Sequence, residues 1–135
     1  MSRNIQSIEG IGPHYAEKLS VAGIRTTKDL LIAGADPSGR RTLSQLTGID
    51  EGQILKWVNM CDLFRIKGVA SQYAELLEAA GVDTVKELRN RNHENLATMI
   101  HKVNQEKRLV RQVPASNRVE GWIDQARKLE PMVSY

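Results

Sequence analysis

The sequence predicts an all-α protein, and three features of the chain support this prediction. Apolar residues recur in several segments at the three- and four-residue spacing of a buried helix face. Residue types that begin and end helices stand at the boundaries of these segments. Sustained alternation of apolar and polar residues, which marks a half-buried strand, is missing apart from the short stretch RLVRQV at 108–113.

The chain also repeats itself, which predicts an internal duplication. Residues 8–30 align with residues 66–88 at an offset of 58 positions, and eleven of the 23 aligned positions are identical. The identical pairs are Ile8/Ile66, Gly10/Gly68, Tyr15/Tyr73, Ala16/Ala74, Glu17/Glu75, Leu19/Leu77, Ala22/Ala80, Gly23/Gly81, Thr26/Thr84, Lys28/Lys86 and Leu30/Leu88. We therefore expect two similar helical units at 1–63 and 64–130, fused into one globular body, and a tail at 131–135.

The first helix of the first copy has clear boundaries. Pro13 stands at the first helical position, where its fixed φ suits a helix, and Gly12 stands at the capping position before it. Ala16 and Leu19 follow at helical spacing, and Gly23 is a helix-terminating glycine. Because glycine has no side-chain oxygen, the first amide groups of this helix lack an internal cap.

The start of the next helix is marked in both copies. Thr26 with Asp29 forms a capping-box signal, in which the threonine and the acid three residues later each accept a backbone N–H. Thr84 with Glu87 repeats the signal. We therefore expect a helix to start after each threonine.

A third hairpin is predicted in the first half. Asp36 begins a further helix that runs to about Leu46. The stretch LSQLTGIDEGQILKW at 43–57 then repeats the opening phrase more faintly, and Asp50 with Gln53 caps the helix that follows. The positions that match the opening phrase are Leu43, Leu46, Gly48, Ile49, Ile54 and Trp57.

The second half closes with two helices, and the residues between the halves (NMCDLF) read as continuing helix. The stretch at 92–108 predicts a long amphipathic helix through Leu96, Met99, Ile100 and Val103. The stretch at 113–129 predicts a last helix that buries Val119, Trp122, Ile123 and Ala126. The expected shared core includes Leu19, Leu30, Trp57, Leu77, Leu88 and Trp122, with both tryptophans as core aromatics.

Composition indicates a globular protein with a modest positive charge. The 135 residues carry a net charge of +3, with 41% hydrophobic and 26% charged residues. Residues 1–63 hold seven basic and seven acidic side chains, so the excess of positive charge lies in the second half. The single cysteine, Cys61, fits a reducing compartment and a buried packing role. No apolar run is long enough to cross a bilayer, so we expect a cytoplasmic protein without a membrane partner.

The opening residues carry a resemblance to a known motif. The pattern Ile5, Ile8, Gly10, Ile11, Gly12, Ala16 and Leu19 resembles a helix-hairpin-helix motif. This resemblance implies a small all-α module that binds DNA without sequence preference, through hairpin amides on phosphates. Two hairpins joined by a connector helix, as at 5–60, resemble the paired helix-hairpin-helix domain of SAM-like architecture. From IEGIGP to MVSY the chain is similar to the bacterial family called domain of unknown function 4332.

The first hairpin is the candidate nucleic-acid-binding site. A helix N-terminus with free amides and a favourable dipole is an anion site, and glycines let a phosphate oxygen approach closely. The candidate residues are Gly10, Ile11, Gly12, His14, Tyr15 and Lys18. The alternative is a purely structural turn between packed helices.

The other hairpins are predicted to be poorer phosphate sites. In the third, the Asp50 carboxylate already fills the anion position. In the second, Ala70 replaces the glycine and resists a positive φ, and Ser71 can cap the helix internally. The fourth, around Ala115 and Ser116, keeps no hairpin glycine.

The residues leave two functions open. The first is weak, sequence-independent binding of DNA, with RNA less favoured, aided by other basic groups if they share the face of the first hairpin. These groups are Arg40, Arg41, Lys67, Arg89, Arg91 and Arg118. The alternative is a protein–protein interaction scaffold with structural hairpins. We expect no catalytic activity, cofactor or small-molecule substrate, because the chain has no Gly-x-Ser-x-Gly motif, Walker loop or dinucleotide fingerprint. We expect no metal, because His14, His93 and His101 lack partners at metal-ligand spacing.

The last residues, EPMVSY, also allow two interpretations. Pro131 stops the preceding helix, and Met132, Val133 and Tyr135 follow it. Such a segment is either a solvated tail or a strip that docks into a groove, on its own domain or on another protein. In the docked case the tyrosine ring is the expected anchor.

Overall fold

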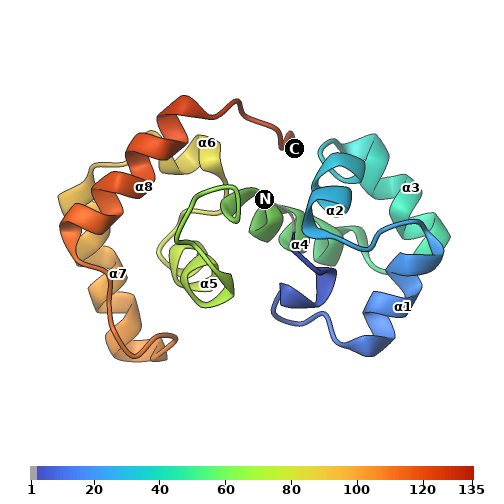
Figure 1. The fold of residues 1–135 in the computed structure, drawn as a ribbon, viewed down its shortest axis with the longest axis horizontal. Helices are drawn as coiled ribbons and strands as arrows, with labels where there is room; N and C mark the ends of the chain where they lie inside the picture. Colours follow the sequence, from blue (N-terminus) through green and yellow to red (C-terminus); the bar gives the residue numbers. More distant parts are fainter. Residues whose placement is uncertain (1–2) are drawn as a thin grey trace. The chain divides into compact units, whose positions relative to one another are not determined.

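The computed structural model describes residues 3–135, and within them the chain is helical (Figure 1). The elements are the 3₁₀ turn η1 (Ile5–Ser7) and the α-helices α1 (Pro13–Val21), α2 (Thr27–Ala33), α3 (Pro37–Thr47), α4 (Glu51–Leu63), α5 (Ser71–Ala79), α6 (Val85–Leu88), α7 (His93–Lys107) and α8 (Ser116–Lys128). The described residues form no strand, and the only extended pairing among them is an isolated bridge between Asn4 and Thr26. The all-α prediction is confirmed. The stretch at 108–113 is a loop, so the suspicion of a strand there is wrong.

The chain divides into two compact units. Unit 1 contains the residues up to Asp62 together with Met132–Tyr135, and unit 2 contains Leu63–Pro131. Helix α4 runs through the junction, as the continuing-helix interpretation of that segment expects. In the colours of Figure 1, unit 1 is blue to green with the last red residues, and unit 2 runs from green to red.

Unit 1 is built around apolar residues from four helices and the segment before them. Leu19 of α1, Leu30 of α2, and Ile54 and Trp57 of α4 are buried. The capping box predicted at Thr26 is present in full: Asp29 N donates to Thr26 Oγ1 at 3.1 Å, and the Asp29 carboxylate accepts from Thr26 N at 3.1 Å. Helix α3 starts at its predicted cap, where Asp36 Oδ1 accepts from the amide of the third helical residue at 2.7 Å.

Unit 2 also buries apolar residues from its four helices. Leu77 of α5, Leu88 of α6, Ile100 of α7 and Trp122 of α8 are all buried. The predicted core of α8 is confirmed in full, since Val119, Trp122, Ile123 and Ala126 are buried.

Positions paired by the 58-residue offset have the same backbone conformation. Gly10 and Gly68 have φ of 94° and 92°, and Gly23 and Gly81 have φ of 86° and 94°. Glycine is needed at these four turns because other residues rarely adopt a left-handed backbone. The hydrogen bonds also correspond: Ile11 N donates to Ile8 O at 3.1 Å in unit 1, and Val69 N donates to Ile66 O at 3.2 Å in unit 2.

Some details of the predicted helices are wrong. Met99 is 43% exposed although it was placed on the apolar face of α7, and Leu46 is 65% exposed whereas Ile8, the position that it matches in the opening phrase, is buried. The capping box at Thr84 is half formed. Thr84 Oγ1 accepts from Glu87 N, but the Glu87 carboxylate pairs with Arg91 at 3.4 Å, and α6 is a single short turn.

Residues 132–135 pack on unit 1 through their backbone. Ser134 N donates to Ala35 O at 2.8 Å, and the buried Arg40 guanidinium donates to Ser134 O at 2.7 Å and to Gly34 O at 2.8 Å. The segment therefore docks on its own domain, as one of the two interpretations expected. The expected anchor is wrong, because the Tyr135 side chain is 66% exposed.

Candidate functional site

The first hairpin presents an open helix start. Gly12 is the residue before α1, its backbone is extended (φ −88°, ψ −172°), and no side chain caps the helix. Pro13 has no N–H, so His14 and Tyr15 carry the first helical amides, which have no partner within the helix. The uncapped start predicted from the sequence is thus confirmed.

The glycine at position 12 is not required by the backbone. An extended residue can be of any type, and a Cβ built on Gly12 meets nothing within 4 Å among the described residues. Gly10 differs, because its φ is 94°. The open space beside Gly12 is therefore not a by-product of a tight turn.

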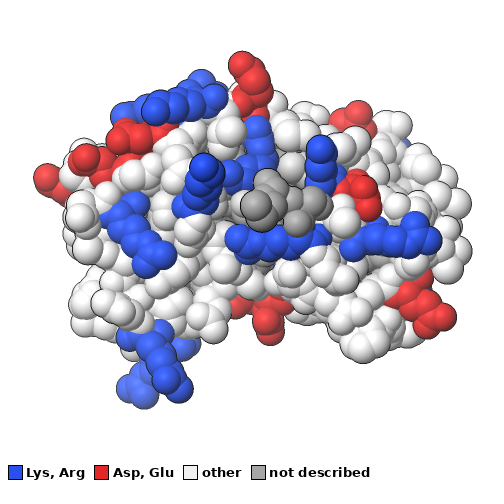
Figure 2. Space-filling view, in the orientation of Figure 1, with Lys and Arg blue, Asp and Glu red and all other residues white. Residues whose placement is uncertain are grey.

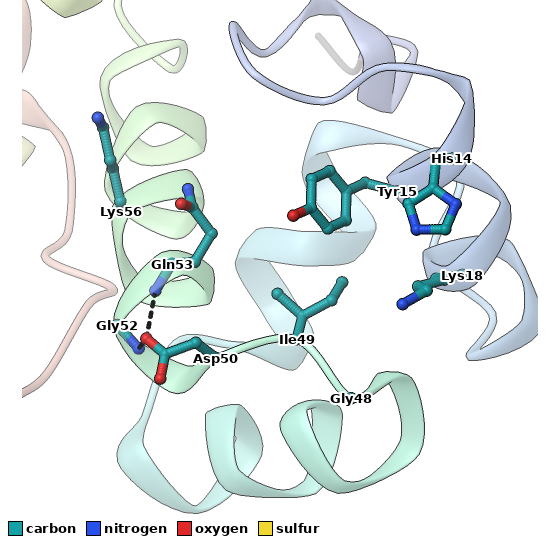
Figure 3. Close-up of a pocket in the computed structure, with 9 residues that line it drawn as sticks. All are labelled: His14, Tyr15, Lys18, Gly48, Ile49, Asp50, Gly52, Gln53 and Lys56. Atoms are coloured by element: carbon teal, nitrogen blue, oxygen red, sulfur yellow. Dashed lines mark hydrogen bonds between the residues drawn. The ribbon is translucent and has the colours of Figure 1, made fainter.

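A pocket of about 420 Å³ lies beside this helix start (Figure 3). Helix α1 contributes His14, Tyr15 and Lys18, and Figure 3 shows Tyr15 and Lys18 extending toward the segment between α3 and α4. That segment and α4 contribute further polar groups, among them Asp50 and Lys56. The structure thus brings three of the six candidate residues into one cavity.

The Asp50 carboxylate lies in the same pocket and is already engaged. Its Oδ2 accepts from Gly52 N at 2.9 Å and from Gln53 N at 3.3 Å (dashed lines in Figure 3). The self-capping of the third hairpin is therefore confirmed. Figure 3 shows Lys56 extending along α4 away from Asp50. With two lysines and one carboxylate, the lining carries one net positive charge.

Aromatic rings support the inner side of the hairpin. The Tyr15 and Trp57 rings meet edge to face with centroids 5.1 Å apart, and a Cβ on Gly10 would lie 3.7 Å from Trp57 Nε1. Ile11 is buried and its amide donates to Ile8 O, so this candidate residue supports the turn from within. Trp57 is a core aromatic as predicted.

Two expectations about the second hairpin, one for Ala70 and one for Ser71, are wrong. Ala70 has a φ of −99°, so the alanine meets no backbone conflict at the position that Gly12 occupies in unit 1. Ser71 does not cap α5: no side chain caps this helix, and the buried Ser71 Oγ has no hydrogen-bond partner in the described part of the chain. The argument against phosphate binding at this hairpin therefore fails on both points.

Several of the other basic residues are engaged within their own unit. The Arg40 guanidinium is buried against the backbone of unit 1. Arg91 pairs with Glu87 and donates to Ala80 O at 3.2 Å, and Arg118 stacks on Tyr73 with its Cζ 4.9 Å from the ring centroid. Arg40 is thereby removed from any basic surface around the first hairpin.

Unit 2 contains a chain of polar contacts at the start of α7 and α8. His93 Nδ1 lies 2.9 Å from Ser116 Oγ, and His93 Nε2 lies 2.9 Å from Glu120 Oε2. These contacts tie the first turn of α7 to the first two turns of α8. No group of three or more His, Cys, Asp or Glu side chains at residues 3–135 could hold a metal ion.

Sequence reasoning missed the contribution of α4 to the first pocket. Lys56 follows Gln53 by three residues, so both lie on one helix face, and this spacing was a signal that the sequence offered. The sequence does not show that this face of α4 lines a pocket together with residues of α1.

Cys61 is buried, as interpreted, and burial raises the pKa of its thiol.

Fold and site together define an all-α protein with a basic pocket at an uncapped helix start. The family model described as Domain of unknown function (DUF4332) matches residues 9–129, so the chain belongs to this family. The comparison with curated proteins gives no match, and neither does the comparison with solved structures. Across residues 3–135, no helix has the length and apolar character that a membrane span needs.

Proposed function

We propose that the protein binds DNA without sequence preference, through phosphate contacts at the first hairpin, and that it is not an enzyme. In this proposal the two units are copies of a duplicated helix-hairpin-helix element that acts in the cytoplasm. RNA is the less favoured nucleic acid, because the hairpin offers groups for a phosphate and none specific to a ribose hydroxyl.

The observation that carries the proposal is the open space in front of Gly12. An Asp, Asn or Ser would fit there without strain and would cap α1, which usually adds stability. Because Gly12 supplies no cap, the first amides of α1 and the positive end of the helix dipole stay available to a ligand. Lys18, one turn further along α1, adds a full positive charge to the pocket that His14 and Tyr15 also line.

The charge of the pocket sets the expected strength. Affinity for DNA depends on the number of phosphates neutralised, and the affinity falls with salt in proportion to that number. Lys18 and Lys56 contact one or two phosphates, and Asp50 opposes them. We therefore expect weak binding with a shallow salt dependence.

The test uses two substitutions at one position. Gly12→Asp places a carboxylate over the helix amides, as Asp50 does on α4, and we expect at least about tenfold weaker binding of a labelled duplex in fluorescence anisotropy at low salt. Gly12→Ala adds a Cβ without a charge, so its affinity should stay within about twofold of the parent. Circular dichroism verifies that both variants are folded. Equal binding by the Asp variant and the parent would remove the first hairpin as the site.

A protein–protein scaffold remains the second candidate, supported by exposed apolar side chains in unit 1. Val21, Ile32 and Leu46 are 85%, 59% and 65% exposed. If they mediate assembly of identical chains, the parent sediments faster as its concentration rises, and a variant with serine at all three positions does not. A parent that remains monomeric at every concentration rules out this form of the scaffold.

A further inference from the structure

Unit 2 contains a second pocket beside the start of α5, the helix that the 58-residue offset pairs with α1. Its volume is about 760 Å³, and it lies between α5 and the loop from α7 to α8. The lining residues that matter here are Gln72, Tyr73, Arg108 and Arg111, and none of the residues that line it is acidic. We call this cavity the arginine pocket.

The loop that carries both arginines is held by one side chain. Asn104 Nδ2 donates to Val110 O at 3.0 Å, and Val110 N donates to Asn104 Oδ1 at 3.0 Å. Arg108 ends α7 with a left-handed backbone (φ 50°), which is unusual for a residue other than glycine. Because these bonds hold the backbone of Val110, the loop itself is ordered before a ligand binds, and only the side chains of the two arginines remain to be ordered.

The charged residues that line the arginine pocket are all basic. Arg108 and Arg111 are exposed at its rim, and Figure 2 shows a group of Lys and Arg side chains over the end of α7 and the loop after it, apart from the acidic side chains visible in this view. The pocket beside α1 has a carboxylate in its lining, and the arginine pocket has none.

Tyr73 gives the arginine pocket a fixed aromatic wall. Its ring packs against Trp122 with centroids 5.5 Å apart, and its hydroxyl donates to Gln112 O at 3.4 Å. The Arg118 guanidinium lies over the Tyr73 ring in a cation–π contact. A third cation therefore stands next to the pocket.

We propose that the arginine pocket binds a phosphate monoester, as found at the end of a nucleic-acid strand or on a free nucleotide. A monoester carries close to two negative charges at neutral pH, which matches the two arginines, whereas an internal phosphodiester carries one. Guanidinium groups bind phosphate oxygens in pairs of parallel hydrogen bonds, and the Gln72 amide is placed to add another donor. This inference is independent of the DNA site proposed for the first hairpin.

The test is a titration followed by ¹⁵N–¹H NMR, with a nucleoside monophosphate, the matching nucleoside and inorganic phosphate as separate probes. We expect saturable shifts at Tyr73 and Val110 with the monophosphate and none with the nucleoside. Arg108→Asn, which keeps a residue tolerant of the left-handed backbone, and Arg111→Gln should each weaken binding by about tenfold or more. The matched control is Arg127→Gln, which removes the same charge from α8 outside the pocket and should leave affinity within about twofold.

A second measurement separates the two sources of the monoester and the two proposed sites. Single strands with a 5′-phosphate, a 3′-phosphate or neither are compared by anisotropy in the Gly12→Asp background, where the first hairpin is blocked. Tighter binding of a phosphorylated strand identifies strand ends, and tight binding of the monophosphate alone identifies a free nucleotide. The proposal is overturned if the nucleoside binds as well as its monophosphate, or if the Arg108 and Arg111 variants match the parent.

Discussion

The contact between Arg40 and the backbone of residue 134 allows a quantitative test of how residues 132–135 are held on unit 1. The perturbation is a chain that stops after Val133, compared with Arg40→Met in the full-length and the shortened chain. Truncation removes the acceptor of one Arg40 hydrogen bond (2.7 Å) and the Ser134 donor to Ala35 O (2.8 Å).

The expected magnitude follows from these two bonds. A hydrogen bond from a charged group and one between neutral backbone groups are together worth about 2–4 kcal/mol. Freeing two ordered residues returns about 1 kcal/mol each in conformational entropy. The net loss of unfolding free energy should therefore be about 1 kcal/mol.

The assay is urea unfolding of the four chains. In the Arg40→Met background the stronger bond is already absent, so truncation should cost close to nothing, and the two changes should be coupled by about 1 kcal/mol. Tyr135→Ala serves as the control, because its exposed ring should contribute less than about 0.5 kcal/mol. We call the hydrogen bonds of Ser134 to Arg40 and to Ala35 the latch. The latch is refuted if the two changes lower the free energy of unfolding additively, or if Tyr135→Ala lowers it more than truncation does.

Three further outcomes test other parts of the structure. Gly10→Ala forces a Cβ onto a φ of 94°, and we expect it to cost about 1–2 kcal/mol in urea unfolding; unchanged stability would contradict the need for glycine there. Cys61 should not react with a thiol reagent in the folded protein, since burial raises its pKa, and labelling should track unfolding; rapid labelling of the native chain would show that the thiol is accessible. The backbone N–H of Arg25 is the largest of the effects that hold the pKa of Asp29 below its ordinary value of 3.8. The Asp29 carboxylate therefore stabilises the fold at pH values above 3.8, and this stabilisation is lost as the pH falls through the lowered pKa. Asp29→Asn should flatten the decline in unfolding free energy between about pH 5 and pH 2. An unchanged pH profile would exclude this contribution.

Local signals in the sequence predicted most of the helices. Pro13, Thr26 and Asp36 each mark a helix start that the structure shows, because caps act within one turn and need no tertiary information. The repeat placed left-handed glycines correctly at turns such as Gly23 and Gly81. Exposure was harder to predict: Leu46 and Met99 fit an apolar stripe by spacing, but no neighbouring element covers them enough to bury them.

The candidate site could be predicted only in part, because local signals in the sequence reveal one of its two sides. The open start of α1 is local, so Gly12 and Lys18 could be chosen from the sequence. The opposing side chains are Asp50, just before α4, and Lys56 on α4, more than thirty residues further along the chain, and their place in the pocket depends on packing that no local pattern encodes. The arginine pocket was missed because its arginines lie on the loop between α7 and α8, and this loop reaches the start of α5 only through packing within unit 2.

The latch at residue 134 also bears on the stability of unit 2. The chain leaves unit 1 at Asp62 and rejoins it at Met132, so unit 2 is a loop closed at both ends while the latch holds. If unit 2 unfolds with its ends still joined, its disordered chain has fewer conformations than a chain with one loose end. Residues 132–135 thus act on unit 2 as a reversible counterpart of a disulfide. Because the latch can open, it cannot stabilise unit 2 by more than its own free energy. The estimate from its two hydrogen bonds puts this limit at about 1 kcal/mol.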